Sequence, residues 1–522
     1  MNATTNLGAV IDPTCDPQRL AFIELDQALT PIEYRFGDIR RCASAVATVL
    51  RQRYAPGERI AVLGANSAHY VAVVLGIMQA GLVAVPLNHR FPAAMIEQVL
   101  EDSGARMAFI DASLTDALPA CLVKVVFDAR SPGEAPHGTQ ALSAFAAQAG
   151  EAHVEPLIAT GDMPALMLYT SGSTGRPKGV VLSHRSHLWV LRTRLAEQVL
   201  DDERLLIAAP LFHMNALALS LLALAAHATV VMLPRFTAPN AIRAIHRWRC
   251  TWLTSVPPMI AMMFQETALL ARTDLSCVRY VRMGSAPVSA ALLAQIQVIL
   301  PKARVINAYG TTEAGPVVFA GHPDGLPTPA LSVGVAHPCV ALRLLDEHGQ
   351  PADEGELLMR SPGMMNGYHN RPDLPTPFTE DGFYRTGDVF RRDEQGFYTF
   401  IGRRDDMFVS GGENLYPGEI ERMLERHPDV EQACVVPVDD AIKGTKPVAF
   451  IVPKARRRLD ADMIKAYALT HAPAHQHPRQ VWFVDALPLA ATNKVDRQAL
   501  KARAAAARAG AADSPAPSTG PL

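Results

Sequence analysis

The chain has 522 residues, 49% of them hydrophobic and 19% charged, and a formal net charge of −2. This length exceeds what one hydrophobic core usually holds, so we expect a globular protein with two or more domains. A charge near zero and the lack of a long basic run argue against a nucleic-acid-binding protein.

The N-terminus, the longest apolar region and the cysteines indicate the cellular compartment of the protein. Met1 to Thr14 has no apolar core of signal-peptide length, and Leu205 to Leu233 is interrupted by a proline, two histidines and an asparagine. We therefore expect neither a secretory signal nor a membrane span. The seven cysteines show no paired spacing, which indicates reduced, mostly buried thiols and no catalytic nucleophile. Together these features predict a cytoplasmic protein.

Strands and helices alternate through the first 110 residues. Residues 19 to 55 predict a strand and an amphipathic helix. The pattern then predicts strand, helix, strand, helix and strand at Arg59–Leu63, Ser67–Ala80, Leu82–Val85, Ala93–Asp102 and Met107–Ile110. Such β-α-β alternation indicates parallel strands with right-handed crossovers. No Gly-x-Gly-x-x-Gly turn is present here, so a dinucleotide site is not expected. Residues 129 to 162 are expected to be a connection.

A glycine- and hydroxyl-rich stretch then joins two apolar strands, Leu166–Leu168 and Val180–Leu182. Consecutive bare N–H groups and hydroxyls form anion-binding concavities, and Lys178 adds a positive charge. We therefore predict a hairpin whose tip binds a polyphosphate through Thr170, Ser171, Gly172, Ser173, Thr174 and Gly175. It is not a Walker loop, because Gly179 follows the lysine where that motif needs Ser or Thr. A flexible surface loop is the alternative.

Further alternation predicts more parallel strands, and three turns follow their carboxyl ends. The predicted helices and strands are His184–Leu200, Leu205–Ala209, Thr229–Leu233, Pro239–Arg249, Trp252–Val256, Val278–Gly284 and Val305–Ala308. Ligands of open α/β sheets bind beyond such ends. The turns are Pro210–Asn215, Ser285-Ala286-Pro287 and Tyr309-Gly310-Thr311-Thr312-Glu313. Tyr309 offers a flat face to a purine, Thr312 a hydroxyl to a phosphate, and Glu313 an oxygen ligand to Mg²⁺.

The pattern changes from Gly334 to Gly402, where short alternating strands separated by Gly, Pro and Asp turns predict a small antiparallel barrel or sheet. Within it, Asp388 can accept hydrogen bonds from both ribose hydroxyls, and Arg403 can hold the ribose or a phosphate oxygen. After residues 403 to 406 the chain predicts a small α/β unit. His471, His475 and His477 lie among prolines and are not expected to bind metal.

The expected fold class is therefore α/β with two domains. A large N-terminal domain, residues 1–402, has mixed and parallel sheets flanked by helices and includes the barrel-like part at about 334–402. A small, mobile C-terminal α/β domain covers residues 403–505. Its tail, residues 506–522, is rich in Ala, Gly, Ser and Pro and is expected to be disordered, although Leu500 to Arg508 could extend a last helix.

Six motifs occur in a fixed order along the chain. They are Thr170–Lys178, Tyr309–Glu313, Tyr384-Arg385-Thr386-Gly387-Asp388, Gly402-Arg403-Arg404-Asp405-Asp406, Ser410-Gly411-Gly412-Glu413-Asn414 and Asn493-Lys494-Val495. In this order they resemble the core motifs of the adenylate-forming enzymes, which are acyl- and aryl-CoA ligases, luciferases and adenylation domains. The resemblance spans residues 169 to 495, and the N-terminal part fits as well.

The resemblance implies an AMP-forming acid–CoA ligase that uses ATP, Mg²⁺ and coenzyme A. Its catalytic candidates are Lys494, Thr312, Glu313 and His213, with Glu313 as the metal ligand. Nucleotide or CoA binding is assigned to the loop Thr170–Gly175 with Lys178 and to Ser285, Ala286, Pro287, Tyr309, Gly310, Thr311, Asp388, Arg403, Gly411, Gly412 and Arg479. Asp405 is the hinge about which the C-terminal domain turns between two half-reactions.

The acid itself is predicted less sharply. The implied pocket residues are His213, Met214, Met283, Gly284, Ala308 and Gly310, and the two glycines are expected to leave room for an apolar acyl group. His213 is also compatible with a purely structural role. Many relatives have Gly before the lysine, whereas halobenzoate-type ligases share Asn493-Lys494, which slightly favours aromatic over medium-chain acids. We expect a small-molecule carboxylic acid as partner, and a homodimer stays open.

Three alternatives remain at this point. A stand-alone adenylation enzyme would load an acyl carrier protein, although no carrier domain is fused to the chain. A luciferase-like oxidation fits the motifs less well. A non-catalytic protein could instead sense ATP or an acyl adenylate, but retention of both Glu313 and Lys494 argues against it.

Overall fold

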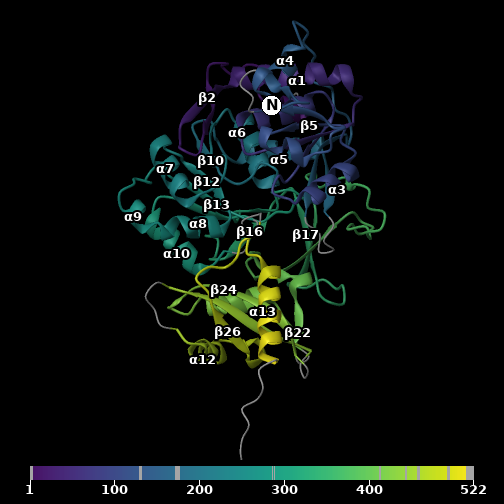
Figure 1. Ribbon diagram of the computed structural model, residues 1–522. Coiled ribbons are helices and arrows are strands. Elements are labelled where there is room, and N and C mark those ends of the chain that lie inside the picture. Colours follow the sequence, from purple (N-terminus) through teal and green to yellow (C-terminus); the bar gives the residue numbers. More distant parts are fainter. Residues whose placement is uncertain are drawn as a thin grey trace, which may run out of the picture.

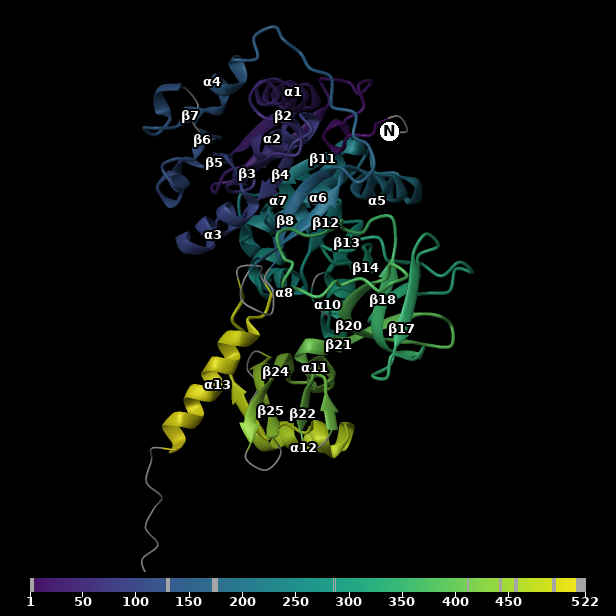
Figure 2. The same ribbon diagram turned by 90° about the vertical axis from the view of Figure 1, so that its right-hand side faces the viewer.

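The computed structural model describes residues 4–127, 132–170, 177–284, 286, 288–410, 413–440, 444–454, 459–490 and 494–512. In this part of the chain the strands form four sheets, of eight, seven, six and five strands. Figures 1 and 2 show a large body coloured purple to green and a smaller lobe, green to yellow, beneath it. The lobe begins after β21 (Tyr398–Arg403).

The first sheet contains the hairpin that the sequence predicted around residue 170. Its strand order is β19-β9-β8-β4-β3-β5-β6-β7. The strands from β8 to β7 run parallel, whereas β9 is antiparallel to β8, and β19 to β9. The bounds are β3 (Arg59–Leu63), β4 (Val83–Pro86), β5 (Met107–Ile110), β6 (Val123–Val126), β7 (Gln140–Ala141), β8 (Pro164–Thr170), β9 (Lys178–Ser183) and β19 (Gly367–Tyr368).

The second sheet carries the turns that were predicted to hold a ligand. Its order is β14-β13-β12-β10-β11-β1-β2, parallel throughout except for the antiparallel β1–β2 edge. The bounds are β1 (Leu20–Leu25), β2 (Pro31–Arg35), β10 (Arg204–Ile207), β11 (Thr229–Met232), β12 (Trp252–Ser255), β13 (Tyr280–Met283) and β14 (Arg304–Asn307). The carboxyl ends of β10, β12, β13 and β14 therefore meet at one edge.

Helices separate and cover the two sheets in layers. The helices of this body are α1 (Phe36–Arg53), α2 (Ala68–Gln79), α3 (Ala93–Ser103), α4 (Leu142–Ala147), α5 (His184–Glu197), α6 (Met214–Ala225), α7 (Ala238–Trp248), α8 (Pro257–Gln265), α9 (Thr267–Leu270) and α10 (Ala290–Ile299). One core cluster joins both sheets through α1, α2, α5 and α6, a second packs α7, α8 and α10 on the outer face of the second sheet, and a third packs α3 on the first. Helix α2 is apolar nearly all round because it lies between the sheets.

The third sheet is antiparallel, as predicted for residues 334 to 402. Its order is β15-β16-β21-β20-β18-β17. The bounds are β15 (Phe319–Ala320), β16 (Ser332–Ala336), β17 (Ala341–Leu345), β18 (Glu354–Arg360), β20 (Tyr384–Arg392) and β21 (Tyr398–Arg403). Asp388 on β20 is paired with Arg403 on β21, so two residues predicted to bind ribose are neighbours.

The C-terminal lobe has its own sheet and two small cores. Its strands are β22 (Phe408–Ser410), β23 (Glu413–Leu415), β24 (Val430–Asp440), β25 (Gly444–Pro453) and β26 (Gln480–Phe483). Helices α11 (Pro417–Leu424) and α12 (Ala461–His471) cover one face, and α13 (Arg497–Ala512) covers the other. Figure 2 shows α13, in yellow, running along the side of the lobe.

Three stretches differ from the sequence expectation. Residues 19 to 55 contain a β-hairpin before α1, because β2 has an exposed outer edge and lacks the apolar run of a buried strand. The expected connection at 129–162 contains β7 and α4, and its residues 128–131 lie outside the described residues. Helix α13 continues to Ala512, past residue 505, because its alanines favour helix.

The membrane-span and cysteine predictions have different outcomes in the described residues. None of the helices in the described ranges is long and apolar enough to cross a membrane. All seven cysteines are free, but only Cys15, Cys250 and Cys434 are buried. Cys121 and Cys339 lie exposed in turns, so the expectation of mostly buried thiols was wrong.

Candidate active site

The turn after β14 brings Tyr309, Thr312 and Glu313 to the carboxyl edge of the second sheet. Thr311 Oγ1 accepts a hydrogen bond from Ala314 N at 3.0 Å, and Gly315 N donates to Thr311 O at 2.9 Å. Gly315 has a φ of +79°, which a side chain would disfavour. Thr312 makes no side-chain hydrogen bond to any residue the structure describes. The turn is therefore held by its own backbone and leaves the Thr312 hydroxyl for a ligand.

Asp388 lies against this turn from the third sheet. The Tyr309 hydroxyl donates to Asp388 Oδ2, while Asp388 Oδ1 lies 3.2 Å from Arg403 Nη1. Thr386 Oγ1 accepts from Asp388 N at 3.0 Å and donates to Leu357 O at 2.7 Å, which fixes the strand around it. Asp388 is only 4% exposed, and desolvation raises its pKa against the opposing effects of Arg403 and the Tyr309 hydrogen bond.

The ring of Tyr309 is packed on one side by phenylalanines. Phe390 and Phe319 meet it edge-on, with ring centroids 4.8 and 5.9 Å away. Burial, followed by the charge of Asp388, raises the pKa of Tyr309 well above its usual value. The tyrosine is therefore a neutral hydrogen-bond donor in a fixed orientation, with a ring that can bound a flat ligand.

Tyr368 joins Glu313 to the base of the predicted phosphate hairpin. Its hydroxyl donates to Glu313 Oε1 at 3.1 Å, and Lys178 Nζ lies 5.3 Å from its ring centroid. Strand β19 places it there by pairing Tyr368 with Val180 of β9. Burial and the nearby Glu313 raise the pKa of Tyr368. The first and second sheets thus contribute to one site, although the hairpin tip, residues 171–176, lies outside the described residues.

His213 and Lys494 complete the charged environment. Desolvation lowers the pKa of His213 to about 4, helped by Lys494 and Arg90, so its imidazole is neutral at pH 7. Its Nε2 is buried and has no hydrogen-bond partner in the described part of the chain. The side chain of Lys494 is exposed to solvent. Even so, desolvation by the surrounding protein lowers its pKa, and the opposing effect of Asp388 is smaller. The lysine charge therefore acts on both His213 and Asp388.

Backbone hydrogen bonds hold Lys494 at the edge of the C-terminal lobe. Ala490 N donates to Lys494 O at 2.8 Å, and Asp496 N donates to Pro488 O at 2.7 Å. Arg497 follows and donates to both carboxylate oxygens of Glu421 on α11, at 2.5 and 2.7 Å, and to Val435 O. A bidentate pair of this kind fixes orientation as well as energy. The lysine is thus fastened to the core of the lobe.

Two family profiles match the chain. The profile described as AMP-binding enzyme matches residues 13–369, and that described as AMP-binding enzyme C-terminal domain matches residues 419–494. The chain belongs to the AMP-binding enzyme family. It is accordingly an AMP-forming acid–CoA ligase, and ATP, Mg²⁺ and coenzyme A are the small molecules that such ligases use. This confirms the resemblance found in the motifs.

Individual relatives of this AMP-binding enzyme cover nearly all of it. It is 32% identical over 471 residues to a feruloyl-CoA synthase from an Amycolatopsis species, across 88% of this chain and 92% of that one. It is 31% identical over 484 residues to the fatty acid–[acyl-carrier-protein] ligase ScoC of Streptomyces coeruleorubidus, across 90% and 91%. ATP-bound MatB from Rhodopseudomonas palustris matches its structure with a TM-score of 0.85 at 28% identity, across 96% and 99%.

The residues of this AMP-binding enzyme fit the nucleotide and metal that its family uses. The buried Asp388 Oδ1 accepts no hydrogen bond within the described ranges, so it can accept one from a ribose hydroxyl at little cost. Glu313 offers a carboxylate for Mg²⁺ beside the hydroxyl of Tyr368. Among the described residues no group of three or more His, Cys, Asp and Glu could hold a metal alone, as expected for Mg²⁺, which is usually shared with phosphates.

Several predicted site residues of this AMP-binding enzyme lie outside the described residues. These are Ser171, Gly172, Ser173, Thr174, Gly175, Ser285, Pro287, Gly411 and Gly412. Ala286 is described between two that are not, and Thr170 is paired with Lys178 at the base of the hairpin. Arg479 donates through its backbone N to Pro447 O, and its buried Nε has no described partner. Asp405 lies in the 3₁₀ turn Arg404–Asp406 between the third sheet and the lobe.

The structure places two of the predicted acyl-pocket residues, Met283 and Met214, in contact with the protein core. Met283 is fully buried in the core behind the second sheet, because its side chain points to the face opposite that of its neighbour Arg282. Met214 contacts a buried histidine, with its Sδ 3.3 Å from His187 Nε2. No sequence motif pointed to Tyr368, because a strand pattern does not say which residues meet from different elements.

The two pocket glycines are constrained by backbone rather than by room for substrate. A Cβ at Gly310 would lie 2.8 Å from both Gly315 O and Pro316 Cα, and one at Gly284 would lie 3.0 Å from Ala308 O. The expectation that the two glycines leave space for an acyl group is wrong on the side of each glycine where a Cβ would lie, because backbone atoms fill that space. Both glycines instead allow the strand-end turns to pack closely.

We expect Gly310→Ala to lower the free energy of unfolding by about 1–3 kcal/mol, because overpacking against fixed backbone costs that much. Adenylation should fall with it, since the displaced turn carries Glu313. Urea unfolding measures the first effect and pyrophosphate release the second. Gly321→Ala is the matched control, because a Cβ there meets nothing within 4 Å. Equal stability of the two variants would contradict the packing argument.

Two buried histidines beside the site predict a pH dependence of stability. His184 and His187 are 1% and 2% exposed, and desolvation lowers the pKa of each to about 4. In the unfolded chain both histidines take up protons below their ordinary pKa of about 6.5, whereas in the native state they do so only near pH 4. Stability should therefore fall as the pH drops from 6.5 to 4, by on the order of 3 kcal/mol for each histidine.

The variant His187→Gln tests this effect, because glutamine does not titrate. Urea unfolding of the wild type and the variant at pH 7.5, 5.5 and 4.5 gives the two slopes of unfolding free energy against pH. The variant's slope should be smaller between pH 6.5 and 4. Parallel slopes would mean that His187 is already protonated, or able to protonate, in the native state.

Proposed function

We propose that this enzyme activates a carboxylic acid with an apolar body, aromatic or medium-chain, and transfers it to coenzyme A. The observation that carries the proposal is the buried Asp388 carboxylate. Its Oδ2 accepts from Tyr309 of the turn that also bears Thr312 and Glu313, and its Oδ1, an ion-pair partner of Arg403, accepts no hydrogen bond in the described ranges. The charge of Lys494 also acts on this carboxylate. This is a nucleotide site next to the strand ends, where the His213 turn and α6 offer an apolar surface.

In the first half-reaction an acid oxygen attacks the α-phosphorus of ATP, and pyrophosphate leaves. The transition state gathers negative charge on the phosphate oxygens, so positioned cations lower the barrier more than any nucleophilic side chain could. Lys494 and Lys178 carry that charge in this chain. Mg²⁺, when bound at Glu313, supplies further positive charge. Thr312 donates to a phosphate oxygen, and Asp388 holds the ribose with Arg403 and Tyr309.

In the second half-reaction the CoA thiol attacks the acyl carbonyl, and AMP leaves with the bonding electrons. The neutral His213 is the N-cap residue of α6 and can orient the acyl carbonyl group through its Nε2, which has no partner among the described residues. Lys494 belongs to the lobe, and the predicted CoA residues Gly411 and Gly412 follow β22 in the sequence. We infer that the lobe turns about Asp405 between the half-reactions, because both groups must reach one site.

A panel of acids tests the proposal. Pyrophosphate release on adding ATP, Mg²⁺ and an acid identifies an adenylating enzyme, and the mass of the product after adding CoA identifies the thioester. If none of the acids in the panel causes pyrophosphate release, the proposed activity is contradicted and a non-catalytic sensor is favoured. Variants Asp388→Asn and Thr312→Ala should weaken ATP use with every acid.

A second candidate acceptor follows from one relative. ScoC is named as a ligase that uses an acyl carrier protein and shares 31% identity across 90% of this chain. Supplying CoA and a phosphopantetheinylated carrier protein in parallel reactions separates the two acceptors. We expect the CoA thioester to form faster than the carrier-protein thioester.

A further inference from the structure

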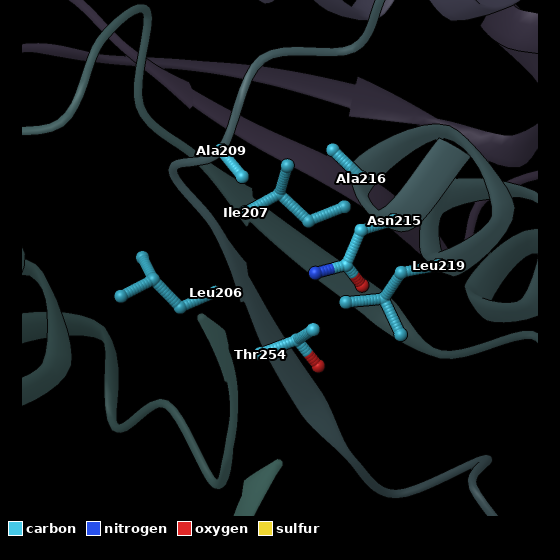
Figure 3. Close-up of a pocket in the computed structure, with 7 residues that line it drawn as sticks. All are labelled: Leu206, Ile207, Ala209, Asn215, Ala216, Leu219 and Thr254. Atoms are coloured by element: carbon cyan, nitrogen blue, oxygen red, sulfur yellow. The ribbon is translucent and has the colours of Figure 1, made fainter. Parts of the chain in front are cut away.

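The C-terminal lobe contacts the large body through α11 and through the start of β24. Helix α11 lies against β21 of the third sheet, and β24 begins beside the end of α8. The narrow space beside α6 does not depend on the lobe, because all seven residues that line it belong to the large body (Figure 3). Contacts that distinguish one orientation of the lobe from another are therefore those of α11 and β24.

The first contact forms at a bulge in β21. The register of β20 and β21 shifts between Val389 and Phe390, which leaves Ile401 without a partner residue on β20. Such an extra residue interrupts the ladder and bends its strand. Arg422 of α11 donates from Nη2 to Ile401 O at 3.1 Å and from Nη1 to Phe400 O at 3.2 Å. A guanidinium of the lobe thus binds two neighbouring carbonyls of the body.

Other groups of α11 pack closely around this contact. A Cβ at Gly418, in the first turn of the helix, would lie 3.2 Å from the same Ile401 O. Glu419 Oε1 lies 3.8 Å from Arg391 Nη2 on β20. Because α11 follows Asp405 in the chain and β21 precedes it, a rotation about Asp405 would separate these groups. The contact therefore belongs to one orientation of the lobe.

The second contact joins α8 to β24. Gln265, the last residue of α8, donates from Nε2 to Glu431 Oε1 at 2.8 Å. Gln265 is exposed and Glu431 partly exposed, so this bond stabilises the orientation less than the Arg422 contact does. Since α8 packs on the second sheet and β21 is part of the third, the two contacts together restrict rotations that either one alone would allow.

This orientation is the one that the proposed first half-reaction requires. Desolvation raises the pKa of Asp388, and the charges of Arg403 and Lys494 oppose that effect. The lysine charge is therefore near the carboxylate that is proposed to hold the ribose. Groups that fix the lobe here also fix Lys494 beside the nucleotide.

We propose that the two contacts, Arg422 with β21 and Gln265 with Glu431, hold the lobe in the orientation for acyl-AMP formation. The inference rests on the proposed function, which supplies the two half-reactions and the rotation about Asp405. The three side chains are positioning residues, because they act through Lys494 and not on a substrate. Their contacts must break before the lobe turns for thiol attack, so weakening them should favour the second half-reaction over the first.

The ratio of the two half-reaction rates measures this effect. The first rate is proportional to the fraction of enzyme in the adenylating orientation, and the second to the fraction that has turned away. Their ratio therefore follows the orientation equilibrium. Single-turnover pyrophosphate release with octanoate or 3-phenylpropanoate, whichever reacts faster, gives the first rate. AMP release from the synthetic adenylate of that acid on adding CoA gives the second.

Arg422→Met should lower the ratio of the first rate to the second by about 10- to 100-fold, because it removes hydrogen bonds from a charged donor. Arg422→Lys keeps the charge and should lower the ratio less. Arg426→Met changes an exposed arginine just beyond α11 and is the matched control, with an unchanged ratio. Equal slowing of both half-reactions in Arg422→Met, or an unchanged ratio, overturns the proposal.

The surface pair tests the second contact with little effect on folding. Gln265→Glu places two carboxylates together and should lower the ratio by about threefold. Adding Glu431→Gln restores an amide facing a carboxylate, in exchanged places, and should return the ratio to that of the wild type. A double variant no better than Gln265→Glu overturns this contact. Circular dichroism melts show whether Arg422→Met is folded, and if it is not, Arg422→Lys and the exchanged pair decide.

The outcomes separate this proposal from the function on which it rests. If no acid causes pyrophosphate release in the wild type, the proposed function itself is contradicted. If both half-reactions proceed, and Arg422→Met and Gln265→Glu keep the wild-type ratio, the function stands and only the positioning role is overturned.

Discussion

Replacing Lys494 by alanine should slow acyl-AMP formation by about 100- to 1,000-fold, the usual loss when a group that stabilises transition-state charge is removed. The second half-reaction should continue, since the lobe that carries Lys494 is proposed to turn away from the nucleotide before the thiol attacks acyl-AMP. Pyrophosphate release measures the first half-reaction. Release of AMP from synthetic acyl-AMP and CoA measures the second.

The structure explains why this variant should remain folded. The Lys494 side chain is exposed, and its backbone is held by hydrogen bonds to Ala490 and by the pairing of the nearby Arg497 with Glu421. Lys501→Ala, on the same lobe in α13, is the matched control and should keep both half-reactions. Equal loss of both half-reactions in Lys494→Ala, with an unchanged melt, would show that the lysine does not serve adenylation alone.

Glu313→Gln should slow adenylation by about 100-fold or more, because it removes the charge that holds Mg²⁺ against the phosphates. The amide keeps an oxygen that can accept the hydrogen bond from Tyr368, now 3.1 Å long, so the local structure should persist. ATP binding, measured by calorimetry, should weaken much less than turnover. The Mg²⁺ concentration for half-maximal pyrophosphate release should rise.

Two controls sharpen the metal assignment. Tyr368→Phe removes the hydroxyl that orients Glu313 but leaves the carboxylate, so its loss should be smaller and its Mg²⁺ dependence closer to that of the wild type. Excess chelator should stop the wild-type enzyme. Full turnover in chelator would contradict a role for metal at Glu313.

The sequence predicted the regular elements well where apolar periodicity is strong. Strands β3 and β5 occupy the predicted residues Arg59–Leu63 and Met107–Ile110, and α2 ends within one residue of Ala80. The β2 edge and the short α4 were missed, since an exposed edge strand and a six-residue helix show too little periodicity.

The site was predicted as far as motifs mark backbone turns. Tyr309, Glu313 and Asp388 were chosen for their chemistry, and the structure brings them together from two sheets. The side-chain direction on β13 was the harder question. A shift of one residue moves a side chain to the opposite face of a sheet. Met283, which was chosen for the pocket, lies in the core behind the second sheet, whereas its neighbour Arg282 lies on the opposite face. Only the pairing of β12 with β13 resolves this.

The attachment of Lys494 to the core of the lobe determines when its charge can reach the nucleotide. Arg497 and the surrounding backbone leave that lysine only its own side-chain rotations, so its charge reaches or leaves the nucleotide only when the whole lobe does. Exposed side chains change rotamer within nanoseconds, whereas domains turn in microseconds to milliseconds. A bound nucleotide facing an open lobe therefore lacks the cation needed for its cleavage. Such an arrangement protects ATP from attack by water until the lobe has closed over the acid.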